Sequence, residues 1–382
     1  MKQRCKQCIM PAEYPGITFD AEGLCSHCAG SNQGIEHTET GLLGKKKLAE
    51  LFRSATKKGQ YDCVVPLSGG KDSIYVLYYS VRELGLKPIA VTYDSGFLTE
   101  VARENVRNAC DALHVPCIIE RANMRIQKRL LKDSLKMSQV VGSFVRTCIN
   151  CSTLIKAIPI RVAKQQHIPF ILWGDSIRES VRLVRLRSKV GTVTYDDVRS
   201  RRFLTALAEK MARLKEVRMT PGKFVRLIPL LVHYRLLSTC QLLSRGVPLK
   251  YVVFPNREPT PPRRGPQVIH FFDYVHWDPV RDLALLRKEL KWHHPPDRTS
   301  RFDCSLYCFT NYGCLRANGI TADGVIACNL IREGLVTRAE ALQAEESRRH
   351  MLMEDCACVA NQLGLKDCPG RGSGNNRPYS EQ

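Results

Sequence analysis

The segment SGGKDS, residues Ser68 to Ser73, collects groups that can bind a phosphate chain. It follows an apolar, β-branched stretch at 62–67, which predicts a short buried strand. It precedes apolar residues at positions 74, 77, 78 and 81, which predict a helix. A strand, a glycine-rich turn and a helix N-terminus present unpaired backbone N–H groups and the positive end of a helix dipole. Such a joint is an anion site, and phosphate commonly fills it.

The side chains of this loop add to the backbone site. The two glycines let the backbone approach a ligand closely. Lys71 contributes a positive charge, the two serines contribute hydroxyl donors, and Asp72 either caps the helix or helps to hold a magnesium ion. Lys71 and Asp72 are also predicted to be catalytic. The predicted nucleotide-binding residues of the loop are Ser68, Gly69, Gly70, Lys71, Asp72 and Ser73.

The loop is shorter than the G-x-x-x-x-G-K-[ST] phosphate loop. It resembles the PP-loop of the ATP pyrophosphatase superfamily, whose signature is SGGKDS. That resemblance implies ATP and Mg²⁺ as cofactors and cleavage between the α and β phosphates. It also implies that AMP is transferred to a substrate oxygen and that a nucleophile then displaces it. A plain glycine–serine turn between two core elements is the alternative interpretation.

Repeating strand–helix units must position this loop. Further strands are predicted at 88–93, 115–119 and 169–173, with helices at about 100–113 and 151–166. This alternation predicts an α/β fold with a doubly wound parallel sheet, of the adenine-nucleotide α-hydrolase-like type that the resemblance implies. Ligands of such sheets bind beyond the carboxyl ends of the strands.

Polar residues gather at that edge of the predicted sheet. Asp94 and Ser95 follow one strand and are expected at the adenosine end of ATP. Gly174 and Asp175 follow another strand, where Gly174 is predicted to line the nucleotide site. Asp175 is predicted to order magnesium, to move a proton or, alternatively, only to cap its strand. Lys156 is a further candidate for a phosphate contact.

The first thirty residues contain two cysteine pairs, Cys5-x-x-Cys8 and Cys25-x-x-Cys28, separated by sixteen residues. Each pair places two sulfurs on one turn, and four thiolates suit a tetrahedral Zn²⁺ ion. The predicted site is structural, because four protein ligands leave no open position. An iron–sulfur cluster or four unrelated thiols are the alternatives.

A third pair, Cys148-x-x-Cys151, precedes the helix that leads to the last predicted strand, and Cys240 lies further along the chain. The arrangement resembles PP-loop tRNA thiolation enzymes. That resemblance implies that the three cysteines hold a [4Fe-4S] cluster whose fourth iron binds sulfide, and that Cys148 and Cys151 are catalytic. Soft thiolates do hold such clusters. Buried core thiols or a second zinc site are the alternatives. Two looser groups form no clear knuckle: Cys304, Cys308, Cys314 and Cys328, and Cys356, Cys358 and Cys368.

Most of residues 1–345 also resemble the N-acetyl sugar amidotransferase family of bacterial surface-polysaccharide biosynthesis. The matching motifs are CxxCxMP, PGITFD and GxCxxC at the start, SGGKDS, and RFDCSLY and REGLVTRAEAL towards the end. This resemblance implies that ammonia from a glutaminase partner replaces an activated oxygen on a nucleotide-linked sugar.

The two resemblances share adenylation of an oxygen and differ in the nucleophile. Sulfur insertion is preferred, because the additional CxxC lies inside the catalytic domain, where amination does not need it. A small nucleobase-like or nucleotide-sugar-like acceptor is preferred over tRNA. A sulfur donor protein or a glutaminase subunit is the expected partner, and a homodimer is a further option. A zinc-ribbon nucleic-acid binder with an inactive loop is a third class, which the intact SGGKDS argues against.

Lysine and arginine exceed aspartate and glutamate by 58 − 37 = 21, an excess that favours an anionic partner or simply solvated helix faces. No apolar run reaches the roughly 18 residues of a membrane helix, and MKQRCKQCIM lacks the apolar core of a signal peptide. A cytoplasmic location is therefore expected, where seventeen cysteines favour metal ligands or reactive thiols over disulfides.

Five regions are predicted along the chain. They are a zinc ribbon and linker at 1–45, a PP-loop domain at 46–180, a basic and mainly helical substrate region at 181–300, a cysteine-containing helical region at 301–370, and a disordered tail at 371–382.

Overall fold

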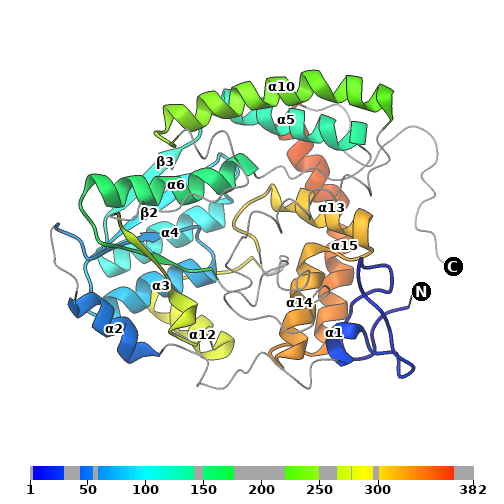
Figure 1. Cartoon of the computed structure of the whole chain (residues 1–382). Coiled ribbons are helices and arrows are strands. Elements are labelled where there is room, and N and C mark those ends of the chain that lie inside the picture. The colour runs from blue at the N-terminus through cyan, green and yellow to red at the C-terminus, as the bar shows by residue number, and fades with distance from the viewer. Residues whose placement is uncertain are drawn as a thin grey trace.

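A computed structural model gives the fold of the chain (Figure 1). The structure describes residues 3–29, 44–54, 59–141, 149–175, 220–248, 265–276, 278–295 and 301–364.

A five-stranded sheet forms the centre of the molecule. Its strands are β1 (Cys63–Pro66), β2 (Pro88–Asp94), β3 (Cys117–Arg121), β4 (Phe170–Trp173) and β5 (Gln267–His270). The strand order is β3-β2-β1-β4-β5, and every neighbouring pair is parallel. The predicted parallel α/β sheet is confirmed, and β1, β2 and β4 start within one residue of their predicted positions.

The fifth strand differs from the expectation. The region 181–300 was predicted to be mainly helical, yet β5 lies within it and pairs with β4 from Phe170↔Gln267 to Trp173↔His270. Four residues are too few to show a period of two. The pairing partner also lies about a hundred positions away, so local sequence could not indicate this strand.

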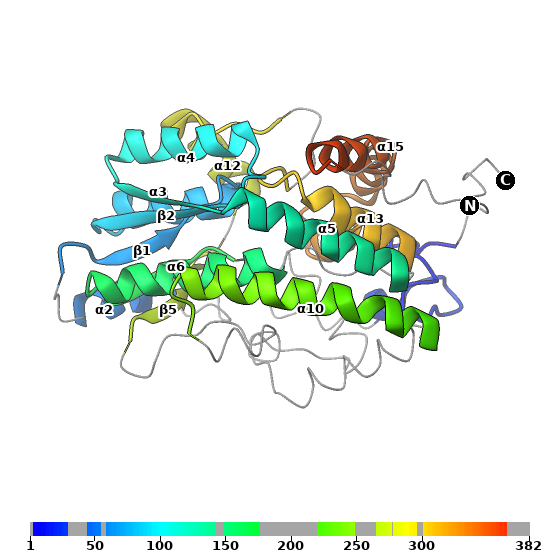
Figure 2. The same ribbon diagram turned by 90° about the horizontal axis from the view of Figure 1, so that it is seen from above.

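Helices cover both faces of the sheet (Figures 1 and 2). The described helices are α1 (Ser26–Ala29), α2 (Lys45–Ser54), α3 (Lys71–Arg82), α4 (Glu100–Leu113), α5 (Met124–Val141), α6 (Ile149–Gln165), α10 (Pro221–Ser244), α12 (Pro279–Leu290), α13 (Tyr307–Asn318), α14 (Ala322–Arg332) and α15 (Arg338–Gln362).

Alternate residues of β1 divide the core into two halves. Cys63 and Val65 pack with buried residues of α2, α3, α4 and α12, whereas Val64 packs with α6 and with Leu242 of α10. A strand buried on both faces explains the unbroken apolar sequence of β1. Because β1 is packed on both faces, the position of the loop that follows it is fixed relative to the sheet.

The C-terminal helices pack against the N-terminal segment of the chain. Ile320 and Val325 pack against the buried N-terminal residues Ile9 and Met10. A capping box begins α15, because the Thr337 side chain accepts a hydrogen bond from the Glu340 N–H and the Thr337 N–H donates to the Glu340 carboxylate at 2.8 Å. No helix within the described ranges is both long and apolar enough to cross a membrane.

Candidate active site and cysteine cluster

The SGGKDS loop joins β1 to α3, as the sequence predicts. Helix α3 begins at Lys71, three residues before Ile74, where the apolar pattern begins. Ser73 organises the turn. Its Oγ accepts the Ser68 N–H at 3.2 Å and donates to the Gly70 carbonyl at 3.1 Å. Gly70 occupies the N-cap position with extended backbone and has no side chain to cap the helix. The positive end of α3 is therefore presented at the carboxyl edge of the sheet without a side-chain cap.

Gly69 must be glycine. Its φ is +84°, and a Cβ there would lie 2.2 Å from the carbonyl oxygen of Ala102 on α4. The Gly69 carbonyl also accepts two hydrogen bonds, from Asn105 Nδ2 at 3.2 Å and from Trp292 Nε1 at 3.1 Å. Both donors are buried. The loop is therefore held by α4 and by a residue more than two hundred positions later, and sequence reasoning found neither contact.

Lys71 and Asp72 form an ion pair, with Nζ 2.8 Å from Oδ1. The two side chains are 18% and 19% exposed, so the pair faces solvent only in part. Gly174 packs directly against this turn, because a Cβ on it would lie 3.3 Å from the Asp72 carbonyl oxygen and 3.3 Å from Ser73 Cα. The end of β4 and the start of α3 are thus in contact, as their predicted shared role requires.

Asp94 and Ser95, at the end of β2, are both buried. The Asp94 carboxylate accepts the Gly96 N–H at 2.8 Å and lies 3.4 Å from Arg103 Nε. These bonds shape the turn after β2 at the same edge as the loop. The predicted contact of Asp94 or Ser95 with adenosine stays a prediction.

Asp175 is paired with a histidine that sequence reasoning missed. His270 is the last residue of β5, and its Nδ1 lies 2.7 Å from Asp175 Oδ1. Without β5, nothing in the sequence placed His270 at this edge. A histidine oriented by a carboxylate can take up or release a proton. Nearby on α6, the ammonium of Lys156 lies 5.9 Å from the centre of the Trp173 ring at the end of β4.

The predicted cluster cysteines are described only in part. Cys148 lies outside the described residues, Cys151 is buried on α6, and Cys240 is exposed on α10. The Cys151 thiol accepts a hydrogen bond from Gln127 Nε2 at 3.0 Å. The residues next to the two cysteines meet, because Asn150 donates to Gln241. Whether the three thiols share a cluster stays a prediction.

The N-terminal cysteines converge as predicted. The sulfurs of Cys5, Cys8, Cys25 and Cys28 lie within 4.8 Å of one another, and all four residues are buried. Backbone N–H groups point at the sulfurs, as for Cys25 N to Cys5 Sγ at 3.2 Å. Hydrogen bonding with the Cys28 thiol contributes most to lowering the pKa of Cys25, to about 7. Four converging thiols fit a tetrahedral metal ion, for which zinc is the proposed identity.

An arginine compensates the charge of this cluster. The Arg332 guanidinium on α14 lies 3.7 Å from Cys8 Sγ and 3.8 Å from Cys28 Sγ. Arg338 on α15 donates to the carbonyl oxygens of Cys5 and Cys8 at 3.2 and 3.0 Å. Four thiolates around a divalent ion carry a net charge of −2, so this partly buried cation lowers the cost of burying that charge. The sequence offered no signal for these contacts.

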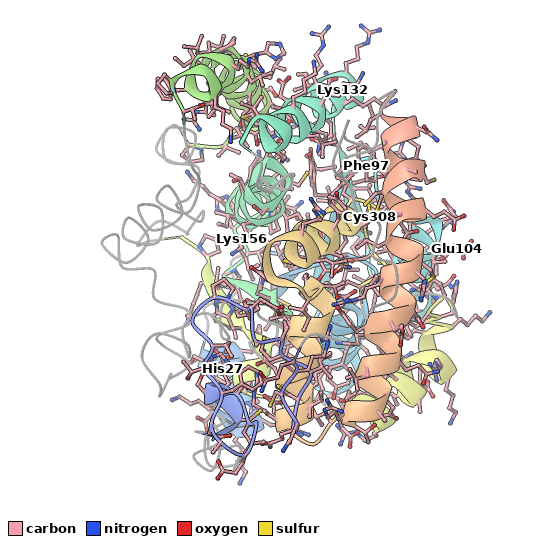
Figure 3. All side chains as sticks on the ribbon, turned by 90° about the vertical axis from the view of Figure 1, so that its right-hand side faces the viewer. His27, Phe97, Glu104, Lys132, Lys156 and Cys308 are labelled. Atoms are coloured by element: carbon pink, nitrogen blue, oxygen red, sulfur yellow. The ribbon has the colours of Figure 1, made fainter. Side chains whose placement is uncertain are left out.

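The remaining cysteines do not form a metal site within the part of the chain that the structure describes, where the N-terminal four are the only such group. Cys308 and Cys356 pack in an apolar cluster with Phe97 and Leu131. Figure 3 shows Cys308 near Phe97. Cys328 is buried among the apolar residues around the N-terminal cluster. Cys368 lies outside the described residues.

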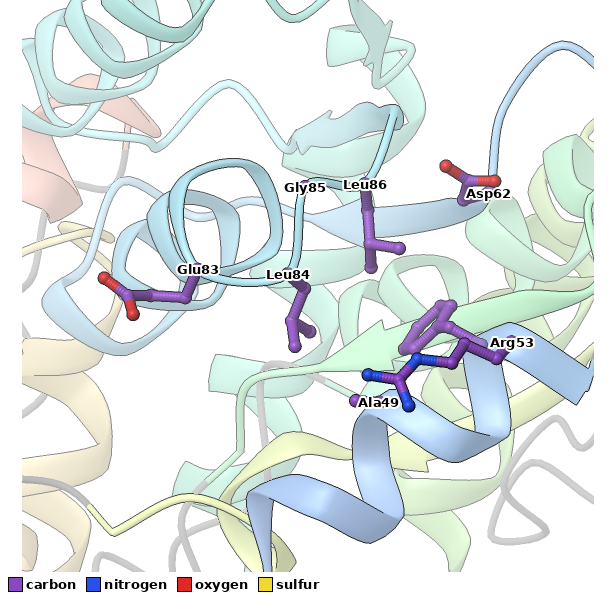
Figure 4. A pocket seen from close by; sticks show the side chains of 8 residues that line it. Ala49, Arg53, Asp62, Glu83, Leu84, Gly85 and Leu86 are labelled. Atoms are coloured by element: carbon purple, nitrogen blue, oxygen red, sulfur yellow. The ribbon is translucent and has the colours of Figure 1, made fainter.

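A hollow of about 500 Å³ lies at the opposite, amino-terminal edge of the sheet (Figure 4). Asp62 before β1 and Leu86 before β2 line it, together with Phe52 and Arg53 of α2. None of the predicted site residues lines it, so it is separate from the candidate active site.

Comparisons with known proteins give distant likenesses. No protein-family model matches the chain. The chain is 24% identical over 195 residues to the uncharacterized protein MJ1599 of Methanocaldococcus jannaschii, which covers 48% of this chain and 66% of that protein. The match thus spans slightly less than two thirds of the length of that relative.

Three solved structures are also similar. The U34-tRNA thiolase NcsA of Methanococcus maripaludis, solved with its [4Fe-4S] cluster, matches at a TM-score of 0.37 and 13% identity over 98% of this chain and 93% of its own. An NMN synthetase of Francisella tularensis matches at a TM-score of 0.27 and 17% identity, over 35% of this chain and 54% of its own. An NH3-dependent NAD synthetase of Campylobacter jejuni matches at a TM-score of 0.28 and 14% identity, over 56% of this chain and 96% of its own.

Proposed function

We propose that this chain is an ATP-dependent enzyme of the PP-loop type, which adenylates a substrate oxygen, releases pyrophosphate and then replaces that oxygen with sulfur. The observation that carries the proposal is a complete SGGKDS loop on a parallel strand-to-helix joint, at the edge of the sheet where ligands bind. Gly69 supports it, because its φ of +84° and its packing exclude every other residue.

The order of the strands suggests which part of the substrates each strand end would contact. The loop after β1 would hold the pyrophosphate end of ATP, with the β2 end near adenosine. The ends of β4 and β5 would then face the acceptor, since they lie on the other side of β1. Lys71 would stabilise negative charge on the departing pyrophosphate. Bound magnesium would supply further charge there.

Sulfur is the preferred nucleophile for a topological reason. Helix α6 ends at Gln165 and β4 begins at Phe170, so α6 runs back from the carboxyl edge of the sheet. Its first turn, which carries Cys151, therefore starts near the edge that holds the loop. The contact between Asn150 and Gln241 also brings the neighbourhood of Cys240 towards Cys151.

Amination is the second candidate function, carried by the motif match to the N-acetyl sugar amidotransferases. It would use the same adenylated oxygen, with ammonia from a glutaminase subunit in place of sulfur. In both cases a small acceptor is proposed ahead of tRNA, because no RNA-binding module is legible in the sequence.

The products of ATP cleavage test the common step. With purified protein, Mg²⁺-ATP, a source of sulfide or ammonium to displace the adenylate, and candidate acceptors such as UDP-N-acetylglucosamine or uridine, we expect AMP and pyrophosphate in equal amounts. Anion-exchange chromatography of labelled ATP measures both. Release of ADP and phosphate would contradict the proposal, because those products come from cleavage between the β and γ phosphates and not between the α and β phosphates.

Cysteine variants separate sulfur from nitrogen. Protein purified without oxygen should be brown and carry about four irons in addition to the N-terminal metal. Cys148→Ser or Cys151→Ser should remove the colour and stop product formation while the adenylation step survives. Cys358→Ser, an exposed thiol on α15, is the matched control and should behave as wild type.

The opposite pattern would favour amination. Colourless protein, active Cys148→Ser and Cys151→Ser variants, and incorporation of labelled ammonium would together exclude the sulfur reaction. Colourless protein with the same variant sensitivity would instead indicate a persulfide, since a cysteine of low pKa can also carry sulfur.

A further inference from the structure

We infer that Asp303 is a ligand of the divalent cation that accompanies the nucleotide at the SGGKDS loop. The inference rests on the proposed function and adds a residue from the C-terminal part of the chain to the site. Neither the loop signature nor the order of the strands pointed to it.

The backbone on both sides of Asp303 is fixed beside the turn that follows β2. Leu98 and Cys304 form an antiparallel bridge, and the Asp303 carbonyl accepts the Thr99 N–H at 3.2 Å. Thr99 Oγ1 donates to the Phe302 carbonyl at 2.9 Å, and Ser305 N donates to the Phe97 carbonyl at 2.9 Å. Thr99 also caps α4. The backbone of Asp303 is therefore held beside the first turn of α4, the helix whose Ala102 and Asn105 contact Gly69.

The Asp303 carboxylate faces the loop. Its Oδ2 lies 4.0 Å from the position that a Cβ on Gly70 would take, beside the N-terminus of α3. The side chain is partly buried, and none of the described residues gives it a hydrogen bond or an ion pair. The nearby Arg301 instead lies over the Tyr307 ring, 5.7 Å from its centre.

The charges at this point need a cation when a nucleotide is bound. Lys71 already pairs with Asp72, so Asp303 adds a negative charge where a triphosphate would bind. A carboxylate beside an anion site repels the anion unless a metal ion lies between them. Mg²⁺ typically takes one or two carboxylates, phosphate oxygens and water. Asp72 in the loop and Asp303 beside it would supply these carboxylates.

A structural role makes a different prediction. A carboxylate at a helix N-terminus can simply stabilise the helix dipole. Replacing it would then change nucleotide affinity by the same factor with and without metal. The dependence of affinity on Mg²⁺ therefore distinguishes a metal ligand from a cap.

The test measures binding of α,β-methylene-ATP, which cannot be cleaved at the proposed bond, to wild-type protein, Asp303→Asn and Asp111→Asn. Calorimetry gives each dissociation constant in excess Mg²⁺ and in EDTA. Asp111 is exposed near the C-terminal end of α4, whose first turn lies beside the loop, so Asp111→Asn controls for net charge.

Wild type and Asp111→Asn should bind the Mg²⁺ complex far more tightly than the metal-free nucleotide. In Asp303→Asn this ratio should fall at least about tenfold, because metal-free binding strengthens as Mg²⁺-dependent binding weakens. An unchanged ratio, whether or not both affinities change, overturns the inference. If wild type binds neither form, the proposed function fails and takes the inference with it. Asp303→Ser replaces the Asn variant if circular dichroism shows that the latter is unfolded.

Discussion

Lys71→Ala is expected to reduce pyrophosphate release by about 10²- to 10³-fold, because it removes a cation from the charge that develops on the leaving group. The fold should survive. Lys71 is the first residue of α3 and is partly exposed, and it forms an ion pair with the adjacent Asp72. Initial rates of pyrophosphate release with saturating Mg²⁺-ATP measure the effect.

Lys164→Ala is the matched control for this variant. Lys164 is exposed in the last turn of α6, near the start of β4 and so at the edge of the sheet away from the loop. It should retain wild-type rates. If Lys71→Ala released pyrophosphate as fast as Lys164→Ala while keeping its circular dichroism spectrum, the SGGKDS loop would not be the phosphate site.

Loss of the N-terminal metal is expected to have the largest effect on stability. Cys25→Ser should release one zinc per chain and lower the thermal midpoint by roughly 10 °C or more, since structural zinc supplies folding free energy directly. The effect should extend beyond the ribbon. Arg332 would no longer lie beside metal-bound thiolates. The packing of Ile9 and Met10 against α14 would weaken, because the metal would no longer hold the N-terminal segment in place.

Metal analysis and differential scanning calorimetry of the full chain measure both quantities. A strong chelator should reproduce the Cys25→Ser midpoint in wild type and leave the variant unchanged. Cys358→Ser serves again as the control thiol. A wild-type chain that purifies without metal and melts at the same temperature as Cys25→Ser would refute a structural metal site.

Local patterns carried most of the predictable part of this structure. The loop joint, β1, β2 and β4 depend on residues within a few positions of one another, so the sequence alone located them. The four N-terminal thiols were also found, because paired knuckles have a fixed spacing.

The parts that were missed all depend on contacts across long sequence separations. The four residues of β5 become a strand only beside β4, and His270 follows from β5. Asn105 and Trp292 meet Gly69 through backbone that no periodicity links. The same reason explains why Asp303 was absent from the predicted site although the motif around it, RFDCSLY, was noted.

The hydrogen bond from Trp292 to Gly69 has a consequence for synthesis on the ribosome. The two residues are 223 positions apart. At about 5–20 residues per second, the loop emerges roughly 10–45 seconds before the tryptophan that holds it. During that interval β4 also waits for its β5 neighbour, so the nascent chain presents an unpaired parallel edge. The loop after β1 thus reaches its final contacts only late in translation, and until β5 is made the β4 edge of the growing sheet is open to pairing with another chain.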